Sequence, residues 1–586
     1  MAQFSNTHRP NVSFVWNILD TVLRDTFLRS ELGDVLLPFI VLRRLDCILE
    51  PVNEAVWKQY NALKDVVSDD KLAPALKAAA GQQFYNTSRY TLTTLLDDAN
   101  NIAINFRLYI NSFNKEVVEI FNCYQFEKVV ARLNRSNRSN RRGLLYSVVS
   151  EVANLPFSPK EVDNHDMGYY FEEILRIAND ESNQQAGEHF TPRDVIRLMS
   201  AILFTPDEKR LRQPGIIRTI YDPTCGTGGM VNIGKRYILE EVCGDMDTKP
   251  EIVTYGQEIN EQTYAIAKSE ALVSGENADN IKLGNTLTED LFASKRFHYI
   301  MANPPYGTSW KKDQAFVLEE SMNPNGRFSA GTPRSSDGQL LFVQHMLSKM
   351  DPDKGSRVGI VTNGSPLFSG GAGSGESNIR GWILNNDWLE AIIALPSDLF
   401  YNTGIATYIW VLTNRKEEQR RGKVQLINAV SFCKPSTKSM GNKRNDILDE
   451  HVKAVLDIYT AFEEGEYSKI MANSDFGRYE LTIEQPQRDD DGKIVYRSGK
   501  PVADASKRDT ERVPLDCNIK EYFAKEVLPN VDPYAWIDRL KTRTHYEINF
   551  NRYFYKYTPL EASDSIAERI TERQNNLINM FNNLFH

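Results

Sequence analysis

Residues 216–229 read IIRTIYDPTCGTGG, and this stretch decides the fold. Its first six residues are largely β-branched, with three isoleucines among them, which predicts a strand. A helix is expected from Met230 onward, because Ile233, Tyr237 and Ile238 recur at helical spacing. A strand, a glycine-rich turn and a helix form the arrangement that holds nucleotides, since the glycines let the backbone approach a ligand at the helix N-terminus.

The next predicted strand, residues 252–257, ends in Glu258. A carboxylate at that strand tip can accept hydrogen bonds from both hydroxyls of a ribose. Glu258 follows Asp222 by more than the roughly 20 residues typical of dinucleotide folds, and the third glycine of the pyrophosphate pattern is missing. Both departures favour a nucleoside cofactor without a pyrophosphate over NAD. A third strand ends near Asn285, which either contacts an adenine edge or simply ends the strand.

A fourth apolar run, residues 297–302, stops at Asn303-Pro304-Pro305-Tyr306. The two prolines make the turn stiff and leave the Pro304 carbonyl without an N–H of its own residue beside it. Asn303 offers a side-chain carbonyl and Tyr306 offers a flat face. Together they can accept the hydrogens of an exocyclic amine and stack on its ring. Taken alone, the same tetrapeptide also suits an ordinary strand-to-loop turn.

Upstream, residues 187–193 read GEHFTPR and lead into a predicted helix. Thr191 is expected to cap that helix, with Pro192 at its first position and Asp194 in its first turn. The pattern equally describes a plain helix start, so its function depends on the other motifs.

Composition narrows the class of protein. The chain has 586 residues, 41% hydrophobic and 25% charged, with a formal net charge of −9. Its length predicts two or three domains. A protein that binds duplex DNA strongly by itself is usually basic, so for a nucleic-acid substrate we expect another chain to supply much of the binding. The six cysteines form no CxxC pair, which argues against zinc and disulfides and favours a cytoplasmic protein. The longest apolar run, near residues 35–42, is too short for a membrane span.

The regions before and after these motifs differ from them in sequence pattern. Residues 1–165 are predicted to be helical. Within them, residues 134–142 carry arginine at every third position and are either a phosphate-tracking loop or a solvated one. A helix is expected over 447–462, and residues 484–512 are polar enough for a long hairpin or loop. The last helix, residues 565–586, presents apolar residues near one face that pack on its own domain or dock on a partner's helices.

The motifs FTP, DPTCGTGG, an acid after the second strand and NPPY, in that order, resemble the amino-methyltransferases that act on DNA. Residues 364–371 (GSPLFSGG), 388–396 (WLEAIIALP), 398–405 (DLFYNTGI) and 546–555 narrow the resemblance to the modification (M) subunits of type I restriction-modification systems. The resemblance covers roughly residues 10–556. It implies an α/β, Rossmann-like class I methyltransferase domain over 166–430, with a mostly parallel seven-stranded sheet. A helical N-terminal domain over 1–165 and a helical C-terminal region over 431–586, with a partner-docking helix, would flank it.

The resemblance also implies an activity, a cofactor and partners. The expected activity is transfer of a methyl group from S-adenosylmethionine (AdoMet) to N6 of a flipped adenine in double-stranded DNA, with no metal. The expected partners are a specificity (S) subunit, a second M subunit joined through it and a restriction (R) subunit, with no membrane. Phe368 and Phe400 are the candidates for a second residue that stacks on the flipped base, although each is more simply explained as a core residue. The site residues implied are Asn303, Pro304, Pro305 and Tyr306 for catalysis and Glu188, His189, Phe190, Thr191, Pro192, Arg193, Asp222, Thr224, Cys225, Gly226, Gly228, Glu258 and Asn285 for the cofactor.

Other functions use similar turns. Cytosine-N4 methyltransferases do so, although the FTP and NPPY pairing favours adenine. Protein glutamine methyltransferases face the same lone-pair problem, but they are much shorter and lack the stretch at residues 364–405. A methyltransferase of another DNA-defence system stays open. A non-catalytic scaffold is disfavoured by the intact Asn303, Tyr306 and Glu258.

Overall fold

The computed structural model describes residues 18, 22–23, 27, 31–135, 143–163, 166–168, 170–171, 174, 191–401, 403–555 and 561–585. The chain divides into two compact units, Met1–Ile548 and Asn549–His586. The arginine-rich prediction at 134–142 falls almost entirely outside the described residues, which resume at Gly143.

The N-terminal part is helical, as predicted. Its core is aromatic: Phe39 packs edge-on against Phe126 with ring centroids 4.9 Å apart, and Phe106 lies 5.8 Å from each of them. No helix of the described residues is long and apolar enough to cross a membrane. The helices are α2 (Leu32–Leu49), α3 (Asn53–Leu63), α4 (Asp69–Ala80), α5 (Ile102–Asn111), α6 (Lys115–Cys123), α7 (Phe126–Arg135) and α8 (Leu144–Ala153).

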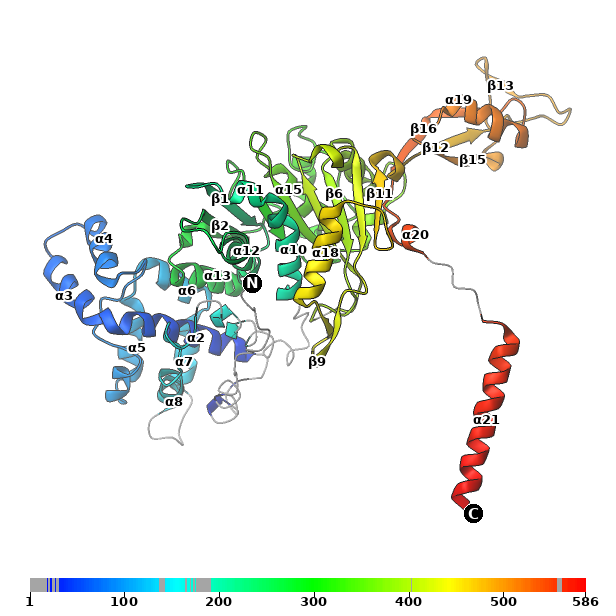
Figure 1. Cartoon of the computed structure of the whole chain (residues 1–586). Coiled ribbons are helices and arrows are strands. Elements are labelled where there is room, and N and C mark those ends of the chain that lie inside the picture. The colour runs from blue at the N-terminus through cyan, green and yellow to red at the C-terminus, as the bar shows by residue number, and fades with distance from the viewer. Residues whose placement is uncertain are drawn as a thin grey trace. The chain divides into compact units, whose positions relative to one another are not determined.

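A nine-stranded sheet in the order β11-β8-β6-β7-β5-β4-β1-β2-β3 forms the centre of the first unit (Figure 1). Seven of these strands, β6 through β3 in that order, make the expected mostly parallel sheet, in which β7 alone runs antiparallel to its neighbours. Two more strands, β8 and β11, extend the sheet past β6, and β11 lies beyond residue 430, where this domain was expected to end. The strands are β1 (Ile217–Asp222), β2 (Glu251–Glu258), β3 (Ile281–Leu283), β4 (Tyr299–Ala302), β5 (Arg357–Asn363), β6 (Leu389–Ala394), β7 (Thr407–Thr413), β8 (Lys423–Asn428) and β11 (Ser468–Ala472).

Helices cover this sheet and position its strand tips. α10 packs against α12, α18 and β5, and α13 packs against α6, which joins the N-terminal helices to the sheet. Figure 1 shows α10, α12 and α18 together over the sheet. The helices of this region are α10 (Arg193–Phe204), α11 (Glu208–Leu211), α12 (Gly229–Tyr237), α13 (Glu261–Val273), α14 (Gln314–Ser321), α15 (Gln339–Ser348), α16 (Ser365–Phe368), α17 (Gly375–Asn385) and α18 (Asp449–Ala461).

The C-terminal region is only partly helical, which corrects the expectation for 431–586. A hairpin pairs β9 (Lys434–Met440) with β10 (Lys443–Asp446). A three-stranded sheet, β15-β12-β16, has a small core of its own made by Leu481, Ile483, Val513 and Val527. The strands are polar because one face of each lies in water. The elements are β12 (Gly477–Glu484), β13 (Tyr496–Arg497), β14 (Lys500–Pro501), β15 (Asp509–Pro514), α19 (Ile519–Tyr522) and β16 (Trp536–Tyr546).

The second unit contains α20 (Phe550–Phe554) and α21 (Ser563–Phe585). The last helix thus begins two residues earlier than the predicted start at Ser565, whose hydroxyl donates to the Ala562 carbonyl. Its apolar residues, among them Ile570 and Phe581, are exposed.

Candidate active site

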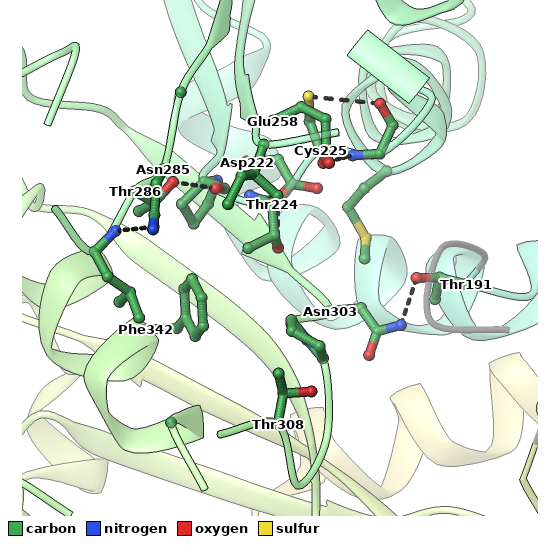
Figure 2. A pocket seen from close by; sticks show the side chains of 18 of the residues that line it. Thr191, Asp222, Thr224, Cys225, Glu258, Asn285, Thr286, Asn303, Thr308 and Phe342 are labelled. Atoms are coloured by element: carbon green, nitrogen blue, oxygen red, sulfur yellow. Dashed lines mark hydrogen bonds between the residues drawn. The ribbon is translucent and has the colours of Figure 1, made fainter. Parts of the chain in front are cut away.

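One cavity of about 270 Å³ brings the four sequence motifs together. Thr191 precedes α10, Asp222 ends β1, Glu258 ends β2 and Asn303 follows β4; all four line the cavity (Figure 2). Because β1, β2 and β4 are parallel, their carboxyl ends meet at one edge of the sheet, where α/β folds hold their ligands.

The glycine-rich turn is held close to β2. Gly226 and Gly228 have φ angles of 53° and 87°, a conformation that glycine adopts without strain. The Cys225 N–H donates to the Gln257 carbonyl at 3.0 Å. A Cβ on Gly256 of β2 would lie 2.7 Å from Cys225 Sγ, so glycine is needed at that position as well. The turn therefore presents its backbone to the cavity in one fixed position.

Asp222 is a buried acid at the start of this turn. Its Oδ1 accepts from the Thr224 N–H at 2.8 Å, which fixes the carboxyl group. Burial raises the pKa of Asp222 to about 7, and the nearby charge of Glu258 adds to the rise. A cation placed in the cavity would favour its ionised form.

Glu258 is fixed by two backbone donors. Its Oε2 accepts from the Gly226 N–H at 2.9 Å and its Oε1 accepts from the Asn260 N–H at 2.8 Å. Each carboxylate oxygen has more than one lone pair, so both keep acceptor capacity toward the cavity. This arrangement can accept from two neighbouring hydroxyl groups.

Asn285 follows β3 and also lines the cavity. This position agrees with the first of the two alternatives for Asn285, a contact with the adenine edge. Its Nδ2 donates to Asp313 Oδ1 at 2.8 Å, and its Oδ1 accepts from the Leu287 N–H at 3.0 Å. Apolar side chains complete this end of the cavity, where a flat ring would fit: Ile259, Leu287, Trp310 and Phe342.

Asn303 is held at both ends of its amide. Its Nδ2 donates to Thr191 Oγ1 at 2.8 Å (Figure 2), and its Oδ1 accepts from the Tyr306 hydroxyl. The predicted capping role of Thr191 is therefore wrong: the residue before α10 is Pro192, without a side-chain cap, and the Thr191 hydroxyl orients Asn303 instead. Among the described residues, no group donates to the Pro304 carbonyl.

Tyr306 packs beside the cavity without lining it. Its ring meets Phe400 edge-on with centroids 6.1 Å apart. Burial raises the pKa of Tyr306 well above its usual value, so its hydroxyl stays protonated and keeps donating to Asn303. Phe400 is buried, as a core residue should be, whereas Phe368 is 55% exposed.

Several of the remaining predicted site residues do not line the cavity. Pro305 lines it, and Pro304 and Gly228 lie in the two turns without doing so. Gly228 instead precedes α12, while Pro192 precedes α10 and Arg193 is the first residue of α10. Glu188, His189 and Phe190 lie outside the described residues.

Comparison with known proteins settles the family. A family model described as N-6 DNA Methylase matches residues 162–492, and one described as HsdM N-terminal domain matches residues 11–152. The first match covers more than half of the chain. The chain belongs to the N-6 DNA methylase family. This confirms the resemblance inferred from the motifs.

Curated relatives of this methylase carry related names. The MjaIX methylase subunit of a type I restriction enzyme from Methanocaldococcus jannaschii is 24% identical over 64% of this chain, which spans 62% of that relative. The MjaVII methylase subunit from the same organism is 28% identical over 76% of this chain and 70% of its own length.

The fold has a solved counterpart. The type I restriction-modification methyltransferase subunit from Streptococcus thermophilus superposes with a TM-score of 0.60 at 21% identity, over 79% of this chain and 95% of that one. The expected class I methyltransferase fold is thus confirmed.

Several lining residues of the methylase were not predicted. Thr308, Ser309, Trp310 and Asp313 directly follow the Asn303 turn, so their position in the sequence was the available signal. Phe342 reaches the cavity from α15, and no local pattern marks it.

Proposed function

We propose that this methylase binds AdoMet in the cavity and methylates N6 of an adenine flipped out of duplex DNA. The observation that supports this most directly is the shared cavity: the Glu258 and Gly226 turn and the Asn303 turn line the same space. Its volume of about 270 Å³ lies just below the usual range for small-molecule sites, roughly 300–1,000 Å³.

The lining residues fit AdoMet. Glu258 would accept from the ribose hydroxyls, and Asp222 would face the ammonium of the methionine part. The apolar walls near Asn285 would hold the adenine ring. When bound, AdoMet supplies a methyl group on a sulfonium, which is a good leaving group. The proposed cofactor contacts are Thr191, Asp222, Thr224, Cys225, Gly226, Glu258 and Asn285, with residues 188–190 and 192–193 as the adjoining segment.

The chain's own task is to make an adenine amine nucleophilic. The amine is a poor nucleophile because its lone pair is delocalised into the ring. Asn303 Oδ1 and the Pro304 carbonyl would accept its two hydrogens and stabilise the charge that develops on the nitrogen. Thr191 helps by holding Nδ2 of Asn303, so that the carbonyl end of the amide faces the substrate. Fixed alignment of the amine and the methyl group then lowers the barrier.

Entry of the base requires a rearrangement at Tyr306. Its hydroxyl now donates to the Asn303 oxygen that the amine needs, and its ring contacts Phe400. We infer that the flipped adenine displaces this hydroxyl and that the ring of Tyr306 stacks on the base. Flipping itself is needed because the amine is paired inside a duplex.

We further propose that the chain acts as the modification subunit of a type I system. A specificity subunit would select the DNA sequence and hold a second copy of this chain, and a restriction subunit would join the assembly. The exposed apolar face of α21 supports docking on helices of the specificity subunit.

Transfer of radiolabelled methyl groups to plasmid DNA, with and without the cognate specificity subunit, tests this function. The product is expected to be N6-methyladenine, identified by mass spectrometry after digestion. N4-methylcytosine, or label appearing in protein and not in DNA, would contradict the proposal.

A further inference from the structure

The β9–β10 hairpin is a basic segment in an acidic chain. Residues 434–446 contain four cationic side chains, Lys434, Lys438, Lys443 and Arg444, against the single acid Asp446. The whole chain has a net charge of −9. A locally positive element in a protein of negative net charge is a means of attracting a polyanion to one place.

The tip of the hairpin is fastened beside the catalytic turn. The Asn442 N–H donates to the Tyr401 carbonyl at 2.6 Å. Gly441 has a φ of +56°, and a Cβ there would lie 2.2 Å from the same carbonyl oxygen. The neighbour of Tyr401 is Phe400, whose ring contacts Tyr306. The hairpin tip is therefore connected to Tyr306 of the catalytic turn through Tyr401 and its neighbour Phe400.

A second anchor connects the hairpin to the other side of the turn. Lys443 Nζ donates to Asp194 Oδ2 at 2.8 Å, and the Ile447 N–H donates to the same oxygen at 2.9 Å. Asp194 lies in the first turn of α10, three residues after Thr191, whose hydroxyl holds Asn303. The tip and the β10 side of the hairpin are thus fixed to two segments that carry catalytic-site residues.

Two cations of the hairpin are available to a ligand. Lys443 is buried and paired with Asp194 and Asp446, so its charge is compensated. Lys434 and Arg444 are exposed, and neither forms an ion pair with a carboxylate in the described part of the chain. The Arg444 guanidinium donates to the backbone carbonyls of Gly441 and Lys443, which orients it and leaves its charge uncompensated.

We propose that the β9–β10 hairpin binds the phosphate backbone of the duplex beside the base that enters the cavity. This inference rests on the proposed function, because duplex DNA is the substrate there. Phosphate contacts fix the register of a protein on DNA without reading sequence. Such a contact next to the catalytic turn would hold the strand whose adenine is flipped.

Substitution of Lys434 and Arg444 tests the inference. In Lys434→Gln/Arg444→Gln, removal of two phosphate contacts should lower the slope of log K against log salt by up to about 1.8, at about 0.9 per contact. The Kd for a short target duplex should rise at least about fivefold. Both are measured by fluorescence anisotropy on the full chain assembled with its specificity subunit, and the Kd for AdoMet should stay the same.

A matched control is available in the β13–β14 hairpin, where Arg497 and Lys500 are also exposed. Arg497→Gln/Lys500→Gln removes the same charge from the chain and should leave DNA affinity and salt slope unchanged. An equal loss in both double variants, or no loss in the first, would overturn the inference. Lost assembly with the specificity subunit at unchanged DNA affinity would also overturn it and mark the hairpin as a protein interface.

A third variant separates position from charge. Gly441→Ala keeps every cation but pushes the tip off Tyr401, so it should also weaken DNA binding and slow methyl transfer at subsaturating DNA. Wild-type affinity in this variant would contradict the proposed placement. If the wild-type assembly binds DNA but methylates no adenine, the proposed function fails separately from the hairpin inference.

Discussion

At the scale of single residues, the central observation is that both ends of the Asn303 side-chain amide form hydrogen bonds. Thr191 holds the nitrogen of its amide and Tyr306 donates to its oxygen. The first contact orients the acceptor, whereas the second covers it. A substrate amine must therefore compete with one hydroxyl and benefits from the other.

Tyr306→Phe and Tyr306→Ala should behave differently. The phenylalanine variant keeps the stacking ring and frees the Asn303 oxygen, so kcat/KM for DNA should remain within about threefold of wild type. The alanine variant loses base stacking worth roughly 1–3 kcal/mol, or about 5- to 150-fold in kcat/KM. Steady-state methyl transfer measures both. An inactive phenylalanine variant would mean that the hydroxyl takes part in the reaction.

Asp222 should make cofactor binding depend on pH. Burial raises its pKa to about 7, so it is mostly protonated in the free protein at mildly acidic pH. If Asp222 faces the cofactor's ammonium, AdoMet affinity should increase up to about tenfold between pH of about 5.5 and 7. Calorimetric titration measures this, and Asp222→Asn should bind more weakly with a flat profile. A flat wild-type profile would remove Asp222 from the cofactor site.

The same shift affects stability with the opposite sign. The folded protein binds more protons at Asp222 than the unfolded chain between its ordinary pKa of 3.8 and about 7. The free energy of unfolding of the free protein therefore loses this contribution as pH rises through that window. Asp222→Asn should reduce the decline.

The residues that could be predicted were those whose role depends on neighbours in sequence. Asn303 follows a strand directly, and Glu258 ends one. The Thr191 contact could not be predicted because it joins residues 112 positions apart. The role of Phe342 could not be predicted either, because its place in the cavity depends on how α15 packs against the rest of the fold.

At the scale of elements, the glycine-rich turn depends on β2. Gly256→Ala would place a Cβ 2.7 Å from Cys225 Sγ, and the turn would have to shift. Overpacking of this kind costs about 1–3 kcal/mol, and we expect the Kd for AdoMet to rise about tenfold or more. Isothermal calorimetry measures it.

Two further variants check this reading. Gly465→Ala should bind AdoMet normally, because a Cβ there meets nothing within 4 Å. Cys225→Ala should partly restore binding in the Gly256→Ala background by removing the sulfur. Failure of that rescue would show that Gly256 acts in another way.

Strands β1, β2 and β4 were predictable because buried parallel strands are nearly continuous apolar runs. The three-stranded sheet of the C-terminal region was not. Its longest strand, Trp536–Tyr546, reads WIDRLKTRTHY and is mostly polar, since much of it faces water. Its one partner in the sheet, β12, lies more than 50 residues earlier in the sequence, so the local pattern could not reveal the pairing.

At the scale of the whole molecule, the second unit should serve assembly and not catalysis. Several apolar residues of α21 are exposed: Ile570, Leu577 and Ile578 are 61%, 58% and 50% exposed. Removal of residues 556–586 should leave the Kd for AdoMet unchanged and abolish co-purification with the specificity subunit. Retained co-purification of the shortened chain would assign docking to the first unit.

The central claim is that the Asn303 turn activates an adenine amine beside the bound cofactor. Single-turnover methyl transfer by Asn303→Ala, measured together with its Kd for AdoMet, tests that claim most directly. Loss of this acceptor should slow transfer by about 10²–10³, as removal of one stabilising group does in other enzymes, with cofactor affinity unchanged. Transfer at the wild-type rate would contradict the account.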